Sequence, residues 1–373
     1  MRIEPFELER WQSLHEHEVE INLSDSGVHP LTARELVQDP GELDGLLDER
    51  LVYTQTNGSL ELRRRVAELH PGAGVENVQI VNGGAEANFL CLWSLLEPGD
   101  EAVVQLPNYG QVPGLVPGLG AELKPWKLRP EFAAGRWVAD LEELAAVVGP
   151  RTRLIALCQP NNPTGARLPA EQLDAVAAVA ARHGAWILCD EIYRGSELDG
   201  RDSASLWGRY ERLVVTGSLS KSYGLPGLRL GWLVGPAEFV AETWGRHDYT
   251  TIGPGALSDR LGRRALDPAT RAELVARTRR HLVASYGIAR DWLTARPGRF
   301  RHLAPEAGAM IFVKHELPIS SLELADRMLR EQRTLIVPGE HFGHPGWLRL
   351  GLGGPGPELS EGLARLAAVV DAL

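Results

Sequence analysis

Short apolar runs alternate with longer helical patterns between about residues 60 and 216, and this alternation is what most restricts the fold. Each apolar run has the length of a buried strand, and turn-forming residues such as Pro98 and Gly99 separate it from its neighbours. Such alternation predicts a mostly parallel sheet that is covered by helices on both faces. The expected strands are Val78–Val81, Ala102–Gln105, Leu154–Cys158, Trp186–Cys189 and Leu213–Thr216.

After about residue 255 the pattern changes. A long helical stretch from Leu257 to about Leu293 precedes two strand-like segments, near 299–304 and 310–314, and the chain ends in a helix over Glu358–Leu373. This order predicts a second, smaller α+β domain. We therefore expect an N-terminal arm that joins the small domain (1–45), a large domain that carries the site (46–255) and the small domain itself (256–373).

Charge and composition exclude several classes of protein. The net charge is −10, which disfavours a nucleic-acid partner because phosphate backbones attract basic patches. No run of 18 apolar residues occurs and the first ten residues are mixed in charge, so we expect no membrane helix, no targeting segment and a cytoplasmic location. Cys91, Cys158 and Cys189 lie in apolar runs without CxxC spacing, which predicts buried thiols and no metal site.

The segment Ser218–Gly231 contains one lysine, Lys221, among small and glycine residues, with Arg229 eight positions later. Small residues allow a ligand to approach the backbone closely. A guanidinium binds phosphate with two parallel hydrogen bonds, and a lysine amine forms imines with aldehydes. The segment therefore predicts a lysine that forms a Schiff base with a phosphorylated aldehyde.

Three further motifs stand at the ends of expected strands. Gly84 and Ala85 begin a helix, and the free N–H groups at a helix start suit a phosphate. Asn162 lies in Asn-Asn-Pro-Thr-Gly, and Asp190 and Tyr193 lie in Asp-Glu-Ile-Tyr. A carboxylate at the end of an apolar strand needs a cationic partner. Taken singly, each motif is also compatible with a plain turn or a helix cap.

The lysine segment and the spacing of these motifs resemble the class I/II aminotransferases, which are fold-type I enzymes dependent on pyridoxal 5'-phosphate (PLP). The resemblance implies an α/β fold with a mostly parallel seven-stranded sheet in the large domain, plus a smaller α+β domain. It implies an aldimine on Lys221 and a later quinonoid, with the phosphate held by Gly84, Ala85, Ser218 and Arg229, the phenolic oxygen by Asn162 and Tyr193, and the ring nitrogen by Asp190.

Three more positions are similar to residues of this family. Tyr109 resembles the aromatic residue that stacks on the cofactor ring, and Arg349 resembles the arginine that holds the substrate carboxylate. Tyr53 resembles the tyrosine that reaches the phosphate of the neighbouring subunit, which implies a homodimer. The implied activity is transfer of the α-amino group of an amino acid, a small-molecule substrate.

The loop Ser24–His29 differs from the Gly-x-Pro loop of common aminotransferases. It is similar to capreomycidine synthase-like enzymes, which cyclise a hydroxylated arginine, and its histidine is similar to that of PLP-dependent arginine oxidases. Gly27 and His29 are therefore candidates for substrate binding, and His29 is also a candidate acid or base. Asp25 and Asp248 are candidates for binding a basic side chain.

Two activities stay open within the family. The motifs Gln159–Gly165 and Asp190–Tyr193 have the ordinary aminotransferase form, so amino-group transfer is the leading hypothesis. The alternative is elimination, cyclisation or oxidation of an arginine-type amino acid in specialised metabolism. A hypothesis of another class is the aminotransferase-like domain of a transcription regulator, but only about 20 residues precede the first family motif, which leaves no room for a helix-turn-helix module.

Overall fold

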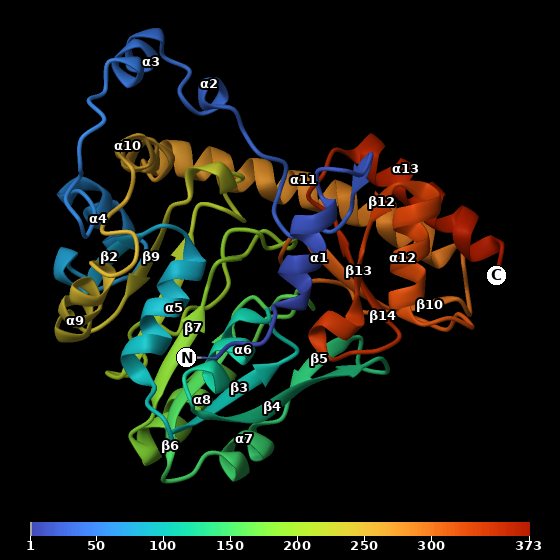
Figure 1. The fold of residues 1–373 in the computed structure, drawn as a ribbon, viewed down its shortest axis with the longest axis horizontal. Helices are drawn as coiled ribbons and strands as arrows, with labels where there is room; N and C mark the ends of the chain where they lie inside the picture. Colours follow the sequence, from blue (N-terminus) through green and yellow to red (C-terminus); the bar gives the residue numbers. More distant parts are fainter. Residues whose placement is uncertain (1) are drawn as a thin grey trace.

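The computed structural model describes residues 2–373 and is centred on one large sheet (Figure 1). Its eight strands have the order β2-β9-β8-β7-β6-β3-β4-β5. Strands β8, β7, β6, β3 and β4 run parallel, β9 is antiparallel to both of its neighbours, and β5 is antiparallel to β4. The strands are β2 (Val78–Val81), β3 (Glu101–Leu106), β4 (Glu122–Glu131), β5 (Arg136–Ala139), β6 (Thr152–Cys158), β7 (Trp186–Asp190), β8 (Leu213–Ser218) and β9 (Gly231–Val234).

The predicted mostly parallel α/β sheet is confirmed, with one strand more than the seven expected. The additional strand is β5, which pairs with the distal half of β4 as a hairpin. No apolar run marks β4 in the sequence, because that strand alternates between exposed charged residues and a few buried ones such as Trp126. This pattern is typical of a strand near the edge of a sheet, and the two prolines in β4 agree with that position.

Helices cover both faces of the large sheet, as expected. Residues that alternate along β3 pack on opposite sides: Val103 belongs to the core under α4 and α8, and Val104 belongs to the core under α5, α6 and α9. The helices around this sheet are α4 (Leu60–Ala67), α5 (Gly84–Leu95), α6 (Gln111–Gly118), α7 (Leu141–Val147), α8 (Ala170–His183) and α9 (Ala237–His247).

A second sheet lies beside the first and has the strand order β10-β11-β14-β13, all antiparallel. It packs with α12, α13 and the later part of α11 around a separate apolar core. Strand β1 pairs in parallel with β12 and brings the N-terminal segment into this core. The elements are β1 (Ile21–Asn22), β10 (Phe300–His302), β11 (Met310–His315), α12 (Ser321–Gln332), β12 (Thr334–Leu335), β13 (Val337–Pro338), β14 (Trp347–Gly351) and α13 (Gly356–Asp371).

The expected single helix from Leu257 to Leu293 is two helices, α10 (Ala256–Ala265) and α11 (Pro268–Thr294). The break has a local cause, because the Asp267 side chain caps the start of α11 and a proline occupies its first position. Leu274 of α11 belongs to the core of the large sheet and Leu282 belongs to the core of the small sheet. One helix thus joins the two cores, and the proposed boundaries at residues 45 and 255 stay predictions.

The N-terminal segment contains α1 (Glu7–His15), α2 (Ala33–Leu36) and α3 (Pro40–Leu47). In Figure 1 α3 projects from the body of the molecule, whereas α1 lies between the two sheets. The cysteines are buried and unpaired, as predicted. Over residues 2–373, every helix is too short or too polar to cross a lipid bilayer.

Candidate active site

A cavity of about 310 Å³ opens where the parallel strands of the large sheet end. Each strand brings one polar group to it: Tyr109 follows β3, Asn162 follows β6, Asp190 ends β7 and Lys221 follows β8. The predicted residues that line this cavity are Gly84, Ala85, Tyr109, Asn162, Asp190, Tyr193, Lys221, Arg229 and Arg349. Four parallel strands and the small sheet therefore bring together residues that lie far apart in the sequence.

One end of the cavity is built to receive an anion. Gly83 has φ +94 and precedes α5, whose first N–H groups have no partner within the helix. A Cβ atom on Gly83 would lie 2.6 Å from Nη2 of Arg229, so only glycine lets the guanidinium come this close. A Cβ on Gly231 would lie 2.6 Å from the backbone nitrogen of Gly84. The helix start and Arg229 together offer N–H groups and positive charge to a phosphate.

Ser218 lies behind this end of the cavity, and Ser220 lines it. The Ser218 hydroxyl accepts a hydrogen bond of 3.0 Å from the backbone N–H of Ser220. The Ser220 hydroxyl lies 3.5 Å from Nη1 of Arg229. The sequence indicated Ser218 and missed Ser220, although both belong to the same motif.

Asp190 forms part of the cavity wall and is held by two donors. Nδ2 of Asn88 lies 2.9 Å from one carboxylate oxygen, and the backbone N–H of Ile192 donates to the other at 3.0 Å. Asn88 is itself fixed, because its Oδ1 accepts from the Thr216 hydroxyl at 2.8 Å. Burial raises the pKa of Asp190, and the two donors act in the opposite direction. The sequence missed Asn88, whose signal was a single amide in an otherwise apolar helix.

Lys221 reaches the cavity from the loop after β8. Its Nζ lies 3.3 Å from Oδ1 of Asp25, and the same oxygen accepts from the backbone N–H of Gly27 at 2.9 Å. Burial lowers the pKa of Lys221, but Asp25 and Tyr193 outweigh that effect and the net shift is upward. Asp25, a candidate for binding a basic side chain, thus contacts the lysine.

Arg349 lies on β14 of the small sheet and is 1% exposed. Its Nη1 donates to Oδ1 of Asn162 at 3.1 Å, and its Nη2 donates to the backbone oxygen of Ser24 at 2.6 Å. Within residues 2–373 its Nε has no hydrogen-bond partner. Beside it the hydroxyl of Tyr193 donates to Oγ of Ser26 at 2.9 Å. Arg349 thus retains donors for a further ligand in a buried position.

The N-terminal helix α1 contributes residues that the sequence did not indicate. Glu9 and Gln12 both line the cavity. The Tyr109 hydroxyl donates to Oε1 of Glu9 at 2.6 Å, and Nε2 of Gln12 lies 3.0 Å from Oγ of Ser24. Burial raises the pKa of Tyr109, and the Glu9 carboxylate adds to the shift. The sequence had predicted no more here than an N-terminal arm over residues 1–45.

Besides Ser218 and Asp25, four predicted positions do not line the cavity. His29 is exposed, and its backbone is bound at both ends, with N–H donating to Gly353 and C=O accepting from Arg277. The predicted acid–base role of His29 therefore gains no support from its position. Gly27 lies beside the site, since a Cβ there would be 3.5 Å from Cδ of Lys221. Tyr53 and Asp248 are exposed outside the cavity.

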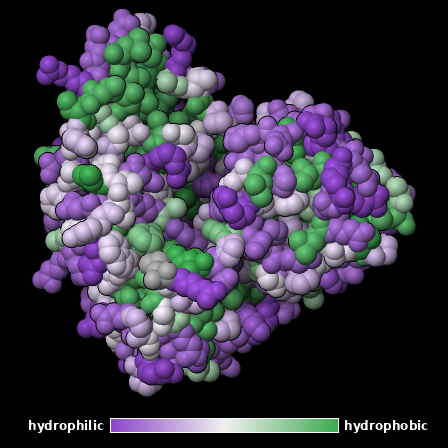
Figure 2. Space-filling view, in the orientation of Figure 1, coloured by the Kyte–Doolittle hydropathy of each residue, from purple (hydrophilic) through white to green (hydrophobic). Residues whose placement is uncertain are grey.

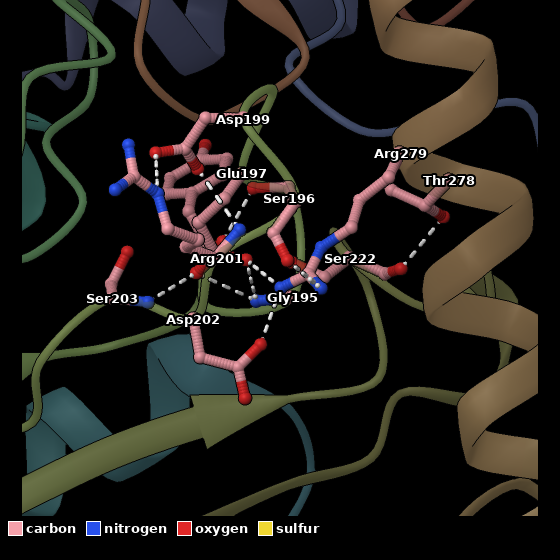
Figure 3. Close-up of polar contacts among 12 residues, drawn as sticks. Gly195, Ser196, Glu197, Asp199, Arg201, Asp202, Ser203, Ser222, Thr278 and Arg279 are labelled. Atoms are coloured by element: carbon pink, nitrogen blue, oxygen red, sulfur yellow. Dashed lines mark hydrogen bonds and ion pairs between the residues drawn. The ribbon is translucent and has the colours of Figure 1, made fainter.

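A buried ionic cluster holds the loop after Tyr193 against α11 (Figure 3). Glu197 is fully buried and accepts from the backbone N–H groups of Gly195 and Ser203, and it forms an ion pair with Arg279 of α11. The neighbouring Thr278 hydroxyl donates to the backbone oxygen of Ser222 at 2.8 Å. One turn of α11 therefore holds both the loop that carries Tyr193 and the loop that carries Lys221.

A second cluster holds the start of α5. Glu86 lies in its first turn and accepts from the backbone N–H of Asn82 at 2.6 Å and from the Thr250 hydroxyl at 2.6 Å. Nε2 of the buried His247 lies 3.2 Å from the same carboxylate. Burial alone would raise the pKa of Glu86, but these hydrogen bonds lower it to about 2. Across residues 2–373, no group of three or more His, Cys, Asp or Glu side chains is arranged to hold a metal ion.

Comparison with known proteins gives consistent results. The model of the family aminotransferase class I and II matches residues 23–366. Capreomycidine synthase of Streptomyces vinaceus is 33% identical over 368 residues, which cover 96% of this chain and 92% of that protein. The arginine–pyruvate transaminase AruH of Pseudomonas aeruginosa is 32% identical over 339 residues, with 87% and 84% covered. A PLP-dependent aminotransferase from Streptococcus suis has a TM-score of 0.93 and 30% identity, with 100% of this chain and 99% of that chain covered.

Proposed function

This chain belongs to the aminotransferase class I and II family of PLP-dependent enzymes, and we propose that it transfers the α-amino group of an amino acid to a keto acid. The observation that carries the proposal is that Lys221, Asp190 and Arg349 meet in one cavity. The reaction requires an amine that moves the proton, a carboxylate that pairs with the cofactor ring nitrogen and a guanidinium that binds the substrate carboxylate.

The cavity fits PLP in both shape and chemistry. Gly83 and Gly231 let Arg229 and the start of α5 pack where a Cβ atom would clash, and these two groups present positive charge to a phosphate. Asp190 at the opposite wall suits a protonated ring nitrogen, and Tyr109 offers an aromatic face. When bound, the cofactor supplies an aldehyde for imine formation and a ring that withdraws electrons from the substrate carbon.

We assign the cofactor contacts to the residues that line the cavity. Gly84, Ala85, Ser220 and Arg229 would hold the phosphate, with Ser218 supporting Ser220 from behind. Asn162 and Tyr193 would hold the phenolic oxygen. Each carboxylate oxygen of Asp190 accepts one of the two bonds, from Asn88 or from Ile192, and retains a lone pair for the ring nitrogen.

Lys221 moves the proton in this proposal. Its Nζ stands over the cavity, where it can accept a proton from the α-carbon of a bound amino acid and return it to a neighbouring carbon. The neutral amine is the form that accepts a proton, so the groups around Nζ control this step. The contact with Asp25 fixes the position of the amine.

Arg349 orients the substrate. Its two contacts, to Asn162 and to the Ser24 backbone, fix the guanidinium plane and leave N–H groups for a carboxylate. A buried guanidinium attracts a carboxylate strongly because water competes little there. Binding by Arg349 would place the α-carbon below the Lys221 amine.

The experiment that tests the proposal is a single half-reaction. Purified holoenzyme is mixed with one amino acid at a time, without an acceptor, and the keto acid formed is quantified. Transamination predicts one keto acid per site and no more, and repeated turnover once pyruvate is added. Continued product formation without an acceptor, or release of ammonia, would rule out amino-group transfer as the activity.

A second candidate is cyclisation, elimination or oxidation of an arginine-type amino acid. It is favoured by the acidic Glu9 in the cavity, a suitable partner for a guanidinium, and by the similarity to capreomycidine synthase. The similarity to an arginine–pyruvate transaminase instead supports amino-group transfer from a basic amino acid. L-Arginine and hydroxylated arginine are the substrates to compare, with product mass and oxygen uptake as the measurements.

We also propose that the enzyme is a homodimer in which Tyr53 reaches the neighbouring site. Large apolar side chains stay exposed on and near the projecting α3 segment, namely Leu47, Leu51, Val52 and Tyr53. Figure 2 shows hydrophobic residues gathered over this projection. Sedimentation of the purified chain as a dimer, together with a loss of cofactor affinity in Tyr53→Phe, would support this proposal. A monomer with full cofactor affinity would contradict it. A cytoplasmic location and the lack of a nucleic-acid partner stay predictions.

A further inference from the structure

The loop Ser24–Gly27 touches three residues of the site at once. The Ser24 backbone oxygen accepts from Arg349 at 2.6 Å, Asp25 lies 3.3 Å from Nζ of Lys221, and Ser26 accepts from Tyr193 at 2.9 Å. Each contact uses a different residue of the loop. The loop therefore forms a cover over the reacting groups, and its acidic residue is placed on the lysine.

The backbone of this loop is seated too closely to shift without repacking. A Cβ on Gly351 would lie 2.3 Å from the backbone oxygen of Asp25, and a Cβ on Gly353 would lie 1.7 Å from the backbone oxygen of Gly27. The N–H of Gly351 also donates to Leu23 at 2.7 Å. The close contact between loop and small sheet depends on these glycines, and it sets where the Asp25 carboxylate stands.

The charges around Nζ of Lys221 require an acidic partner. Arg349 is a cation close enough to oppose a second positive charge, whereas Tyr193 and Asp190 lie near without a direct contact to Nζ. Asp25 is the carboxylate that contacts it. The lysine side chain is 26% exposed and the aspartate side chain is 55% exposed, so water weakens the pair but does not replace it.

We propose that Asp25 is a positioning residue for Lys221, and that its carboxylate holds Nζ over the cavity as an ammonium once the free amine has accepted a proton. The inference rests on the proposed role of Lys221 and adds a partner for it. It also gives Asp25 a task other than binding a basic substrate. The ammonium retained by Asp25 carries the proton that the next step delivers to the neighbouring carbon.

The test measures the proton affinity of Lys221 directly. The chain is loaded with pyridoxamine 5'-phosphate, which carries an amine instead of the aldehyde and leaves Lys221 free. Acetic anhydride labelling across a pH series, followed by mass spectrometry of the Lys221 peptide, gives the titration midpoint. We expect Asp25→Asn to lower that midpoint by about one unit, so that Lys221 is labelled about tenfold faster at any pH below it.

Matched variants complete the test. Asp25→Glu should restore most of the wild-type profile, and Asp291→Asn, which removes an exposed carboxylate on α11, should leave it unchanged. Asp25→Ser serves for the same measurement if Asp25→Asn does not fold. A labelling profile that is identical in the wild type and in the folded Asp25 variant would overturn the inference.

A separate arm distinguishes this inference from the proposed function. Borohydride reduction of the PLP-loaded wild type should attach the cofactor to Lys221. If the cofactor is found elsewhere, the proposed function fails. If it is found on Lys221 and the Asp25 variants titrate like the wild type, only the role of Asp25 fails.

Discussion

The floor and the roof of the cavity are built differently. We call the residues at the strand ends of the large sheet, Asn162, Asp190 and Lys221, the floor, and we call α1, the loop Ser24–Gly27 and Arg349 of β14 the roof. The floor is set by strand register, and Asp190 is held by a donor only two positions away. The roof is joined by single contacts across long separations, such as the 325 positions between Arg349 and Ser24.

This difference separates chemistry from selectivity. A strand end is fixed by its neighbours on both sides, so the floor holds in place the groups that we propose take part in the reaction. The roof depends on a few side-chain contacts and on α1, and changes there alter which substrate fits. Five substitutions test this division.

Lys221→Ala should have the largest effect, because it removes the amine that we propose forms the imine and moves the proton. We expect kcat/KM to fall by about 10⁴-fold while the thermal midpoint changes little. Steady-state assays together with scanning calorimetry check this. Activity within tenfold of the wild type would show that the reaction does not require the Lys221 amine.

Glu197→Ala should be next, because it leaves Arg279 without its buried partner. Breaking a buried ion pair from one side destabilises a protein by about 3–5 kcal/mol. Chemical denaturation measures this, with Asp202→Asn as control, because that carboxylate is 67% exposed. An equal loss in the free energy of unfolding for both variants would show that the buried Glu197–Arg279 pair stabilises the fold no more than the exposed Asp202 does.

Arg349→Lys tests the roof. The lysine keeps the charge but cannot form the forked contact with a carboxylate, and we expect kcat/KM to fall by about 10²-fold. An amine substrate that lacks a carboxylate serves as the control, and its rate should be the same in both enzymes. An equal loss of rate for both substrates would show that Arg349 acts on the reaction in general and does not bind the substrate carboxylate.

Glu9→Gln should change selectivity more than rate. The amide still accepts from the Tyr109 hydroxyl, so α1 keeps its contact while the cavity loses a negative charge. We expect the preference for L-arginine over an uncharged amino acid of similar length to fall about tenfold. Competition between the two substrates measures it, and a preference equal to that of the wild type would remove Glu9 from substrate recognition.

Glu86→Gln should have the smallest effect, visible in the dependence of stability on pH. The folded pKa of Glu86 is lowered to about 2 from its usual 4.5, so its stabilisation is complete above 4.5 and is lost as the pH falls toward 2. The thermal midpoints of wild type and variant should differ most above pH 5 and converge in acid. A difference in thermal midpoint that does not change with pH would show that Glu86 stabilises the fold through its hydrogen-bond geometry and not through its charge.

Sequence reasoning was most successful for the floor. Apolar strands such as Leu154–Cys158 and Trp186–Cys189 are visible locally, and a polar residue at the end of each becomes a site residue by a general rule of parallel sheets. It failed for β4, whose exposed charged residues hide the strand, and for the single helix that Asp267 and Pro268 divide into two. Asn88 was missed because nothing local shows that it contacts Asp190.

Periodicity and motif spacing are enough to predict the fold class and the groups available for chemistry, because both act over short stretches of chain. The tertiary structure alone decided the partners. It placed Asp25 on Lys221 and Glu9 on Tyr109, and it left His29 outside the cavity. These pairings join segments 100 to 196 positions apart, and they depend on how the two sheets and α1 pack, which no local pattern encodes.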